Sequence, residues 1–303
     1  MTGTHSQIEA VLAQAGRVIL GKETQIRLCL TCLLARGHLL LEDIPGVGKT
    51  TLAHTLAKTL GLSFQRIQFT SDLLPADVLG VSIFDRESGS FRFQRGPIFS
   101  QLVLADEINR ASPKAQSALL EAMEEHQVTL DGQSMALPDP FFVVATQNPQ
   151  DQVGTFPLPE SQLDRFLMRV HLGYPASGAE RELLAGIDRR DLVDALTTVV
   201  SPDALKSLQR SVMEVHVSAA LLDYIQALVA HTRRSPGLTA GLSPRAAIGL
   251  LRAARAWALI DARAAVIPED VQAVFASVVE HRVRQRGAEA GAAQRLLEAV
   301  PIP

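Results

Sequence analysis

The sequence has little of three features that would assign it to particular classes of protein. Among its 303 residues there are only two cysteines, the net charge is −3, and no apolar run reaches the length of a membrane span. The weak negative charge gives no support for general affinity for nucleic acid. Residues 1–15 lack the basic segment and the apolar core of a signal peptide, so we expect a cytoplasmic protein.

The two cysteines, Cys29 and Cys32, have the C-x-x-C spacing found in redox and zinc sites. A structural zinc site needs four ligands, and the sequence has no second cysteine pair. Both cysteines fall within residues 26–34, which have an apolar helical pattern, and their spacing places them on one face of a helix. We therefore expect two buried thiols in the core.

Residues 39–51, with the sequence LLLEDIPGVGKTT, are the centre of the predicted chemistry. The apolar residues 39–41 predict a buried parallel strand, and residues 49–60, followed by Gly61, predict a helix. A glycine-rich turn and a Gly-Lys-Thr sequence between a strand and a helix are typical of a phosphate-binding P-loop. The strict pattern has glycine where this chain has Asp43, so a glycine-rich turn in another α/β protein is the alternative.

The P-loop interpretation assigns a role to each part of this segment. Backbone N–H groups of the turn and the positive end of the helix would hold the β-phosphate of ATP. Lys49 would reach the β- and γ-phosphates, and the hydroxyl of Thr50 would bind Mg²⁺. The residues predicted to bind the nucleotide are Pro45, Gly46, Val47, Gly48, Lys49, Thr50, Thr51 and Asp106.

Two further apolar strands are predicted to end in polar residues beside the P-loop. One leads to Asp106 and Glu107, and a second, residues 141–146, leads to Asn148. Ligands bind at the carboxyl ends of parallel strands. We therefore expect Asp106 to bind Mg²⁺, Glu107 to orient the attacking water, and Asn148 to bridge that water and the γ-phosphate. The alternatives are an acid pair that caps a neighbouring helix and an Asx turn before Pro149.

Two arginines are predicted to lie away from that edge. Arg165 stands just before the last predicted strand, residues 168–172, so it starts from the opposite edge of a parallel sheet. Five strand residues span about 17 Å, which puts Arg165 out of easy reach of its own nucleotide but lets it serve a neighbour's. Arg245 lies in the first turn of a helix predicted at 244–262, where the helix dipole disfavours a cation, so we expect an anion nearby, such as an ATP phosphate. The alternatives are a surface ion pair for Arg165 and an exposed, inert side chain for Arg245.

The order of the predicted elements indicates two domains in a soluble globular chain. Residues 1–174 contain the predicted strands, residues 175–200 are predicted to be a linker and connecting helix, and residues 201–303 a helical lid. The pattern after the linker is purely helical. Helices are predicted there at 179–188, 202–210, 218–232, 244–262 and 269–285.

Two hairpins are predicted to interrupt the α/β order. Residues 75–93 contain two apolar stretches around a Glu-Ser-Gly turn, and residues 128–137 surround an Asp-Gly turn. We expect the tips, residues 86–90 and 131–134, to project from the core and contact a partner. The alternative is a pair of surface loops that bind no partner.

Taken together, the sequence resembles the MoxR family of AAA+ ATPases over roughly residues 8–285. Four stretches carry the resemblance: GHLLLEDIPGVGKTTLA, LADEINRASPKAQSALLEAMEE, ATQNP and GTFPLPESQLDRF. Matched by position, the resemblance implies the Walker A pair Lys49 and Thr50, the Walker B pair Asp106 and Glu107, sensor 1 at Asn148, the arginine finger at Arg165, and sensor 2 at Arg245.

The resemblance also implies a fold and a function. The fold would be a P-loop NTPase αβα sandwich with a parallel five-stranded sheet, followed by a C-terminal all-α lid domain. The two hairpins would be the helix-2 insert and the pre-sensor-1 hairpin, and their tips would face the pore of a ring or a client protein. Such proteins are regarded as ring-shaped chaperones that hydrolyse ATP with Mg²⁺ and mature or activate partner proteins, often with von Willebrand factor A domain partners and metal cofactor insertion. We therefore expect a homo-oligomer, in the form of a hexameric ring, and a client protein.

Three other functions remain open at this point. A nucleic-acid motor with a similar core is opposed by the slightly acidic charge and by the lack of an appended DNA-binding module. A magnesium-chelatase-type motor subunit is a close variant of the favoured function. A small-molecule P-loop kinase would need neither Arg165 in trans nor two hairpins. Gel-shift assays with DNA and ATPase assays with candidate proteins would separate these classes.

Overall fold

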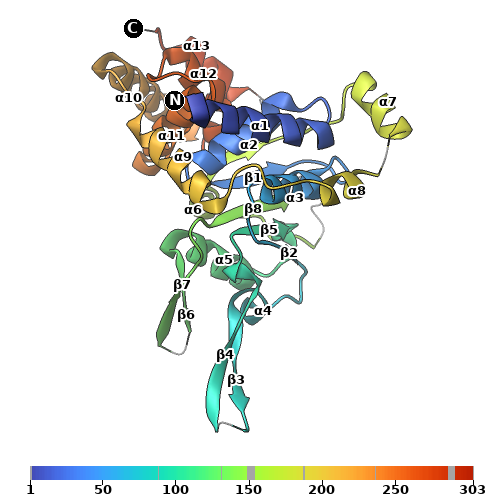
Figure 1. Ribbon diagram of the computed structural model, residues 1–303. Coiled ribbons are helices and arrows are strands. Elements are labelled where there is room, and N and C mark those ends of the chain that lie inside the picture. Colours follow the sequence, from blue (N-terminus) through green and yellow to red (C-terminus); the bar gives the residue numbers. More distant parts are fainter. Residues whose placement is uncertain are drawn as a thin grey trace.

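The chain folds around a five-stranded parallel sheet (Figure 1). The strands lie in the order β2-β5-β8-β1-β9, and every neighbouring pair runs parallel. Their bounds are β1 His38–Glu42, β2 Phe64–Gln68, β5 Leu102–Asp106, β8 Phe142–Gln147 and β9 Phe166–Val170. The computed structural model describes residues 2–87, 89–130, 132–148, 154–186, 188–235, 237–285 and 291–302. The predicted α/β fold with a parallel five-stranded sheet is confirmed.

The strand order places β5, β8 and β1 in the middle of the sheet, where their residues are almost all buried. Strands covered on both faces need such apolar runs, which is why the sequence pattern revealed them. The edge strand β2 is instead mostly exposed. β9 begins at Phe166, two residues before its predicted start, so Arg165 still stands immediately before it.

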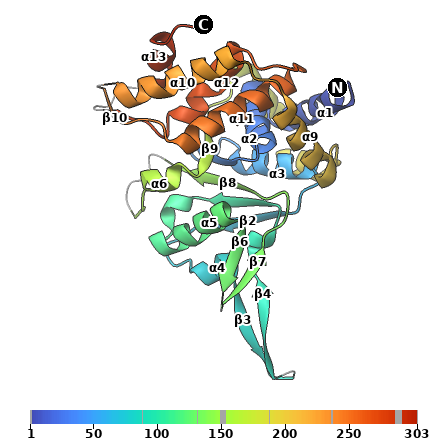
Figure 2. The ribbon, with the colours of Figure 1, turned by 90° about the vertical axis from the view of Figure 1, so that its left-hand side faces the viewer.

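Helices cover both faces of the sheet (Figures 1 and 2). On one face, Leu39 and Leu41 of β1 share an apolar cluster with helices α1, α2 and α3, whereas on the other face Leu40 shares one with α5. The bounds are α1 Thr2–Val18, α2 Glu23–Leu34, α3 Lys49–Thr59, α4 Pro75–Leu79, η1 Pro97–Phe99, η2 Ile108–Arg110, α5 Pro113–Glu125 and α6 Glu160–Leu163.

Cys29 and Cys32 are free thiols buried in α2, as predicted. Burial raises the pKa of Cys29 to about 12, and it also raises the pKa of Cys32. Both thiols therefore stay protonated at neutral pH and are poor nucleophiles and poor metal ligands.

Two antiparallel hairpins project from the end of the molecule opposite the C-terminal helices (Figures 1 and 2). One pairs β3 Gly80–Asp85 with β4 Ser90–Arg95, and the other pairs β6 Gln127–Leu130 with β7 Gln133–Ala136. Both predicted hairpins are thus confirmed. Of their predicted tips, Ser88 and Asp131 lie outside the described residues.

The C-terminal part is mainly helical, but two short strands, β10 and β11, pair antiparallel within it. The prediction of a purely helical pattern was wrong at this point, and the helix predicted at 269–285 ends at Val279. It ends there because His281 and Arg282 turn towards β9 and bond its backbone carbonyl oxygens. The bounds are α7 Ser177–Ala185, α8 Arg189–Asp194, α9 Pro202–Glu214, α10 Ala219–Arg234, β10 Leu238–Ala240, α11 Pro244–Ile260, α12 Pro268–Val279, β11 Arg284–Gln285 and α13 Ala292–Glu298.

One apolar cluster runs from the sheet through α2 into α9, α11 and α12. Gln209 on α9 adds a buried hydrogen bond, in which its Nε2 donates to the carbonyl oxygen of Leu33 at 2.9 Å. The C-terminal helices therefore rest on the amino-terminal helices as well as on the sheet. Within the described part of the chain, none of the helices combines the length and the hydropathy that crossing a membrane requires.

Candidate functional site

The predicted P-loop forms a tight backbone turn between β1 and α3. Gly46 and Gly48 have φ angles of 83° and 94°, which other residues rarely adopt. A Cβ at either position would meet no atom within 4 Å, so the backbone angle and not the available space calls for glycine. Gly48 precedes α3 and provides no side-chain cap. The first N–H groups of the helix are consequently available to bind a phosphate.

Asp43, which stands where the P-loop pattern has glycine, fixes the loop in place. Its Oδ1 accepts a hydrogen bond from the N–H of Ile44 at 2.9 Å, and its Oδ2 accepts one from the N–H of Gly173 at 2.5 Å. The Nζ of Lys49 donates to the carbonyl oxygens of Asp43 and Ile44, to the second at 2.9 Å. The departure from the pattern thus anchors the loop to the segment after β9.

A cavity of about 290 Å³ brings the predicted P-loop, acidic and amide residues together. Val47 is not among the lining residues, because its side chain packs against the core. The lining residues are Pro45, Gly46, Gly48, Lys49, Thr50, Thr51, Asp106, Glu107, Thr146, Gln147 and Asn148.

The oxygen atoms in this cavity suit a hard cation. Mg²⁺ binds carboxylate and hydroxyl oxygens, and it takes one or two protein ligands together with phosphates and waters instead of an all-protein cage. Thr50 and Asp106 offer that limited set. Among the described residues, no group of three or more His, Cys, Asp or Glu side chains could hold a metal ion by itself. The chemistry of the site therefore fits Mg²⁺ bound together with a nucleotide.

Asp106 is buried, and both of its carboxylate oxygens are bonded. Oδ1 accepts a hydrogen bond from the Oγ1 of Thr146 at 2.5 Å. Oδ2 accepts from the Nε and Nη2 of Arg66, a half-exposed residue of β2, at 3.0 and 2.6 Å. A cation of the chain itself thus occupies one face of the carboxylate that is predicted to bind the metal ion.

Glu107 follows the end of β5 in a left-handed backbone conformation with a φ of 56°. Its N–H donates to the Oγ1 of Thr146 at 2.9 Å, which ties it to Asp106 through one hydroxyl group. Its Oε2 accepts from the Nε2 of Gln68 at 3.0 Å and lies 3.2 Å from the Nε of Arg110. The carboxylate is therefore held on the β2 side of the cavity.

Sequence reasoning missed Arg66 and Gln68. Both lie on β2, which pairs with β5 in a register that places Gln68 opposite Asp106. Polar residues at positions 66 and 68, two apart and so on one face of a strand, were a signal in the sequence, but only the strand order shows which acids they meet. The strand order brings Arg66 to Asp106, although the two residues are 40 positions apart in the sequence.

Asn148 is buried at the carboxyl end of β8 and lines the same cavity. Residues 149–153 lie outside the described residues, and Pro149 with them, so the alternative Asx turn is not part of the described structure. Burial lowers the pKa of Lys49, while the carboxylates of Asp43, Asp106 and Glu107 act in the opposite direction. The cavity therefore combines one partly buried cation with a surplus of carboxylates.

Arg165 and Arg245 lie together at a second place, which we call the arginine site. It is a cavity of about 460 Å³ whose lining includes both residues and Glu124 but no P-loop residue. The Nε of Arg165 lies 2.8 Å from the Oε2 of Glu124, and the Nη1 of Arg245 lies 2.7 Å from its Oε1. The anion that Arg245 meets within the subunit is thus a carboxylate from the last turn of α5.

A buried ion pair supports the arginine site. The Nε of Arg282 donates to the Oδ1 of Asp164 at 2.6 Å, and Arg282 also bonds the carbonyl oxygens of Phe166 and Leu167 at 2.6 and 3.0 Å. The Oγ of Ser243 donates to the Oδ2 of Asp164 at 3.0 Å. Burial lowers the pKa of Arg282, whereas the hydrogen bond that it donates to Asp164 raises it.

Asp164 therefore joins the two chain segments that carry the arginines. It directly precedes Arg165, and its partner Ser243 caps the amino terminus of α11 by accepting a hydrogen bond from the N–H of Ala246 at 3.0 Å. Arg245 lies in the first turn of that helix. Sequence reasoning identified both arginines but not Asp164, Arg282 or Glu124, because their partners are distant in the sequence. Ser243 is 79 residues from Asp164, and Arg282 is 118 residues from it.

The P-loop cavity and the arginine site lie at opposite ends of β1. His38, the first residue of β1, pairs with Phe166, directly after Arg165, whereas the P-loop follows Glu42 at the other end. The five residues of β1 span about 17 Å. The predicted placement of Arg165 on the edge opposite the P-loop is confirmed.

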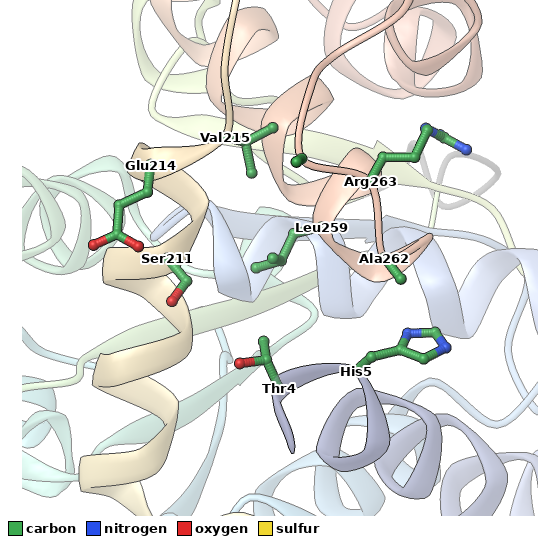
Figure 3. A pocket seen from close by; sticks show the side chains of 9 residues that line it. Thr4, His5, Ser211, Glu214, Val215, Leu259, Ala262 and Arg263 are labelled. Carbon is green, nitrogen blue, oxygen red and sulfur yellow. The ribbon is translucent and has the colours of Figure 1, made fainter. Parts of the chain in front are cut away.

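A further cavity, of about 260 Å³, lies among α1, α9 and the turn after α11 (Figure 3). Thr4 and His5 line it from α1, Ser211 and Glu214 from α9, and Arg263 from the turn. None of the predicted site residues lines it. It therefore has no part in the chemistry predicted from the sequence.

Comparisons with known families and structures agree with this geometry. The family model described as "ATPase family associated with various cellular activities (AAA)" matches residues 38–168, and the model "AAA lid domain" matches residues 230–300. A crystal structure of a Cytophaga hutchinsonii protein assigned as an ATPase is 38% identical, with a TM-score of 0.90 over 98% of this chain and 94% of that one.

Several curated relatives match over most of this chain. The Bacillus subtilis protein YeaC is 45% identical over 99% of this chain and 96% of its own length. "Chaperone MoxR1" of Mycobacterium tuberculosis is 40% identical over 91% of this chain and 75% of its own length. "Protein MoxR" of Paracoccus denitrificans is 35% identical over 92% of this chain and 89% of its own length.

Proposed function

The chain belongs to the MoxR family of AAA+ ATPases, and from this premise we propose that it hydrolyses ATP in a homo-oligomeric ring and uses the cycle to remodel a client protein. The observation that carries the proposal is the separation of the P-loop cavity from the arginine site at opposite ends of β1. Within one subunit the phosphate-binding site thus lacks Arg165 and Arg245, and the arginine site lacks a nucleotide-binding loop. A head-to-tail contact between two subunits would complete both.

Each residue of the P-loop cavity has a role in this proposal. The backbone of residues 45–51 binds the phosphates, and Lys49 leaves the carbonyl oxygens of its own loop to reach the β- and γ-phosphates. Mg²⁺, bound by Thr50 and Asp106, would neutralise charge on the β- and γ-phosphates.

The attacking water belongs to Glu107 and Asn148 in this scheme. The carboxylate of Glu107 accepts a hydrogen bond from the water and orients it towards the γ-phosphorus, and Asn148 donates its side-chain amide to the γ-phosphate. The Nε2 of Gln68 now donates to the Oε2 of Glu107, so this bond is exchanged when that oxygen accepts the water.

The neighbouring subunit supplies Arg165 and Arg245. As charge shifts from the γ-phosphoryl group towards the β-phosphate, two guanidinium groups from the next subunit stabilise the transition state. An arginine supplied in trans accelerates such reactions by roughly 10³- to 10⁵-fold. Arg245, which the sequence suggested as a ligand of ATP, would thus act on the neighbour's nucleotide together with Arg165.

The finer parts of the proposal follow from the family. We propose a hexamer that acts in the cytoplasm, with a nucleotide-binding core at 1–174, a connecting segment at 175–200 and a lid at 201–303. The client, with or without a von Willebrand factor A domain partner, would contact the two projecting hairpins, where Phe91 is 73% exposed. A magnesium-chelatase-like motor is the second candidate, and a nucleic-acid motor the third.

A mixing experiment tests the shared site. The Arg165→Ala and Glu107→Gln variants are each expected to be inactive, but mixed rings contain interfaces that join an intact Glu107 to an intact Arg165. Recovery of ATPase activity above the sum of the two separate variants supports a site between subunits. If mixed rings form and no activity returns, the proposal is wrong.

A further inference from the structure

We propose that Glu124 is a positioning residue that holds Arg165 and Arg245 as one unit in the free subunit and releases both to the neighbour's ATP phosphates on assembly. This inference rests on the proposed function in a ring. It starts from a single carboxylate whose two oxygens each contact a different arginine, at 2.8 and 2.7 Å. On assembly, a phosphate group from the next subunit would replace this carboxylate as the partner of both arginines.

Glu124 and Arg245 each lie at a helix end whose partial charge disfavours their own charge. Glu124 lies in the last turn of α5, where the partial charge of the helix end disfavours an anion. Arg245 lies in the first turn of α11, where the opposite partial charge disfavours a cation. Each charge is badly placed on its own helix, and each is compensated by the other.

The cavity around the two arginines is rich in further positive charge. Arg36, Arg252 and Arg282 also line it, against the carboxylates of Glu124 and Asp164. Asp164 is already bonded to Arg282, and Arg36 is paired with Asp139 at 3.1 Å. Glu124 is thus the carboxylate in contact with the two arginines, and without it their guanidinium groups would repel each other and separate.

Exposure distinguishes this contact from the supporting ion pair beside it. The Arg282 side chain is only 5% exposed in its pair with Asp164, so that pair is fixed by burial. The side chains of Glu124, Arg165 and Arg245 are 38%, 26% and 48% exposed. A ligand from outside can therefore replace Glu124 without unfolding the site.

A triphosphate is the ligand that fits this exchange. It carries more negative charge than one carboxylate and has enough oxygens to bond both guanidinium groups. Assembly must nevertheless break two ion pairs before the arginines can bind it. Glu124 therefore sets how readily subunits assemble around ATP, while it keeps the two arginines ready to bind one anion together.

The test measures ATPase activity and, by sedimentation, ring formation as functions of protein concentration in the presence of ATP and Mg²⁺. The midpoint is the protein concentration at which each reaches half of its maximum. Glu124→Gln preserves the shape of the side chain and removes its charge, so we expect the midpoint to fall by roughly three- to tenfold, as for the loss of two partly exposed ion pairs. Glu125→Gln, an equal change of charge on the next, exposed residue of α5, serves as the matched control and leaves the midpoint unchanged.

Two outcomes would overturn the inference while leaving the ring proposal intact. If Glu124→Gln has the same midpoint as Glu125→Gln, Glu124 does not compete with phosphate for the arginines. A raised midpoint would make Glu124 a structural brace between α5 and α11. A wild-type rate that does not depend on protein concentration would instead overturn this inference and the proposed function together.

A second variant shows whether Glu124 acts through the arginines. In an Arg165→Gln/Arg245→Gln background, Glu124 has no guanidinium group to hold, so adding Glu124→Gln should leave ring formation unchanged. A fall of the midpoint in that background would contradict the inference. If Glu124→Gln lowers the melting temperature, Glu124→Asp, which keeps the charge but is too short to contact both arginines, is expected to lower the midpoint by a smaller factor.

Discussion

The P-loop cavity and the arginine site belong to one sheet but compensate their charges in different ways. In the P-loop cavity the carboxylates of Asp106 and Glu107 are bonded by side chains of β2, and the phosphate-binding groups are backbone N–H groups. In the arginine site the cations are bonded by Glu124 of the same subunit. In each site, groups that the proposed function pairs with a ligand from outside are thus bonded by side chains of the same subunit.

The largest effect is expected from substitution of Lys49, which should abolish the function of the P-loop cavity. Lys49→Ala removes the cation that is expected to contact the β- and γ-phosphates, so nucleotide binding should be lost and turnover with it. Binding of a fluorescent ATP analogue measures the effect. Lys58→Ala, on the same helix and in an exposed pair with Asp194, should bind like the wild type. Normal affinity in Lys49→Ala would contradict the P-loop assignment.

Substitution of Arg165 should impair the arginine site and leave nucleotide binding in the P-loop cavity intact. Arg165→Ala should retain nucleotide binding within the subunit but lose roughly 10³- to 10⁵-fold in turnover, together with the rise of activity at higher protein concentration. Parallel measurements of ATP affinity and phosphate release separate the two effects. Arg210→Ala, an exposed arginine of α9, is the control. If Arg165→Ala turns over ATP like the wild type, Arg165 forms only a surface ion pair and has no role in catalysis.

The scaffold of the arginine site should matter for stability. Asp164→Ala leaves the buried guanidinium group of Arg282 without its carboxylate, which should lower the free energy of unfolding by about 3 kcal/mol, the low end for a broken buried pair because Asp164 is partly exposed. Denaturant unfolding measures this change. The exposed pair of Asp203 and Lys206 offers a contrast, since Asp203→Ala should change stability little. Equal effects of the two substitutions would be evidence against a supporting role for Asp164.

The smallest effect is expected at Arg66, which bonds the carboxylate of Asp106 that is proposed to bind Mg²⁺. Arg66→Gln removes the competing cation, so the Mg²⁺ concentration needed for half-maximal ATPase activity should fall by roughly two- to fivefold, the size expected for one half-exposed ion pair. Arg92→Gln, on the exposed β4 strand, should leave it unchanged. A higher Mg²⁺ requirement would show that Arg66 orients Asp106 for the metal instead of competing with it.

Sequence patterns predicted those parts of the molecule in which neighbouring residues determine the structure. The buried run before the P-loop, the glycine turn and the amphipathic α3 are local, and so are the apolar strands that end in Asp106 and Asn148. Parallel strands then bring their carboxyl ends to one edge, which correctly grouped Asp106, Glu107 and Asn148 with the P-loop. The opposite position of Arg165 followed from the same rule.

The parts that sequence could not predict depend on contacts between distant segments. Gln68 reaches Glu107 only because β2 lies beside β5, and Arg245 reaches Glu124 only because α11 is anchored to Asp164. The end of α12 at Val279 has the same origin, since Arg282 bonds carbonyl oxygens of β9. Hydrophobic periodicity contains no information about such partners, so the site residues were found but their resting bonds were not.

The two projecting hairpins would make the two faces of a ring of such subunits different. If the P-loop cavity of each subunit meets the arginine site of the next, the contact is head-to-tail and rotation about one axis generates a closed ring. All β3–β4 hairpins then lie at one height along that axis, and so do all β6–β7 hairpins, while in each subunit both project from the end opposite the C-terminal helices (Figure 1). No two-fold axis exchanges the two faces of such a ring. A polypeptide that meets the hairpins therefore approaches from one defined side, so the order of the subunits around the ring also determines from which side a client is engaged.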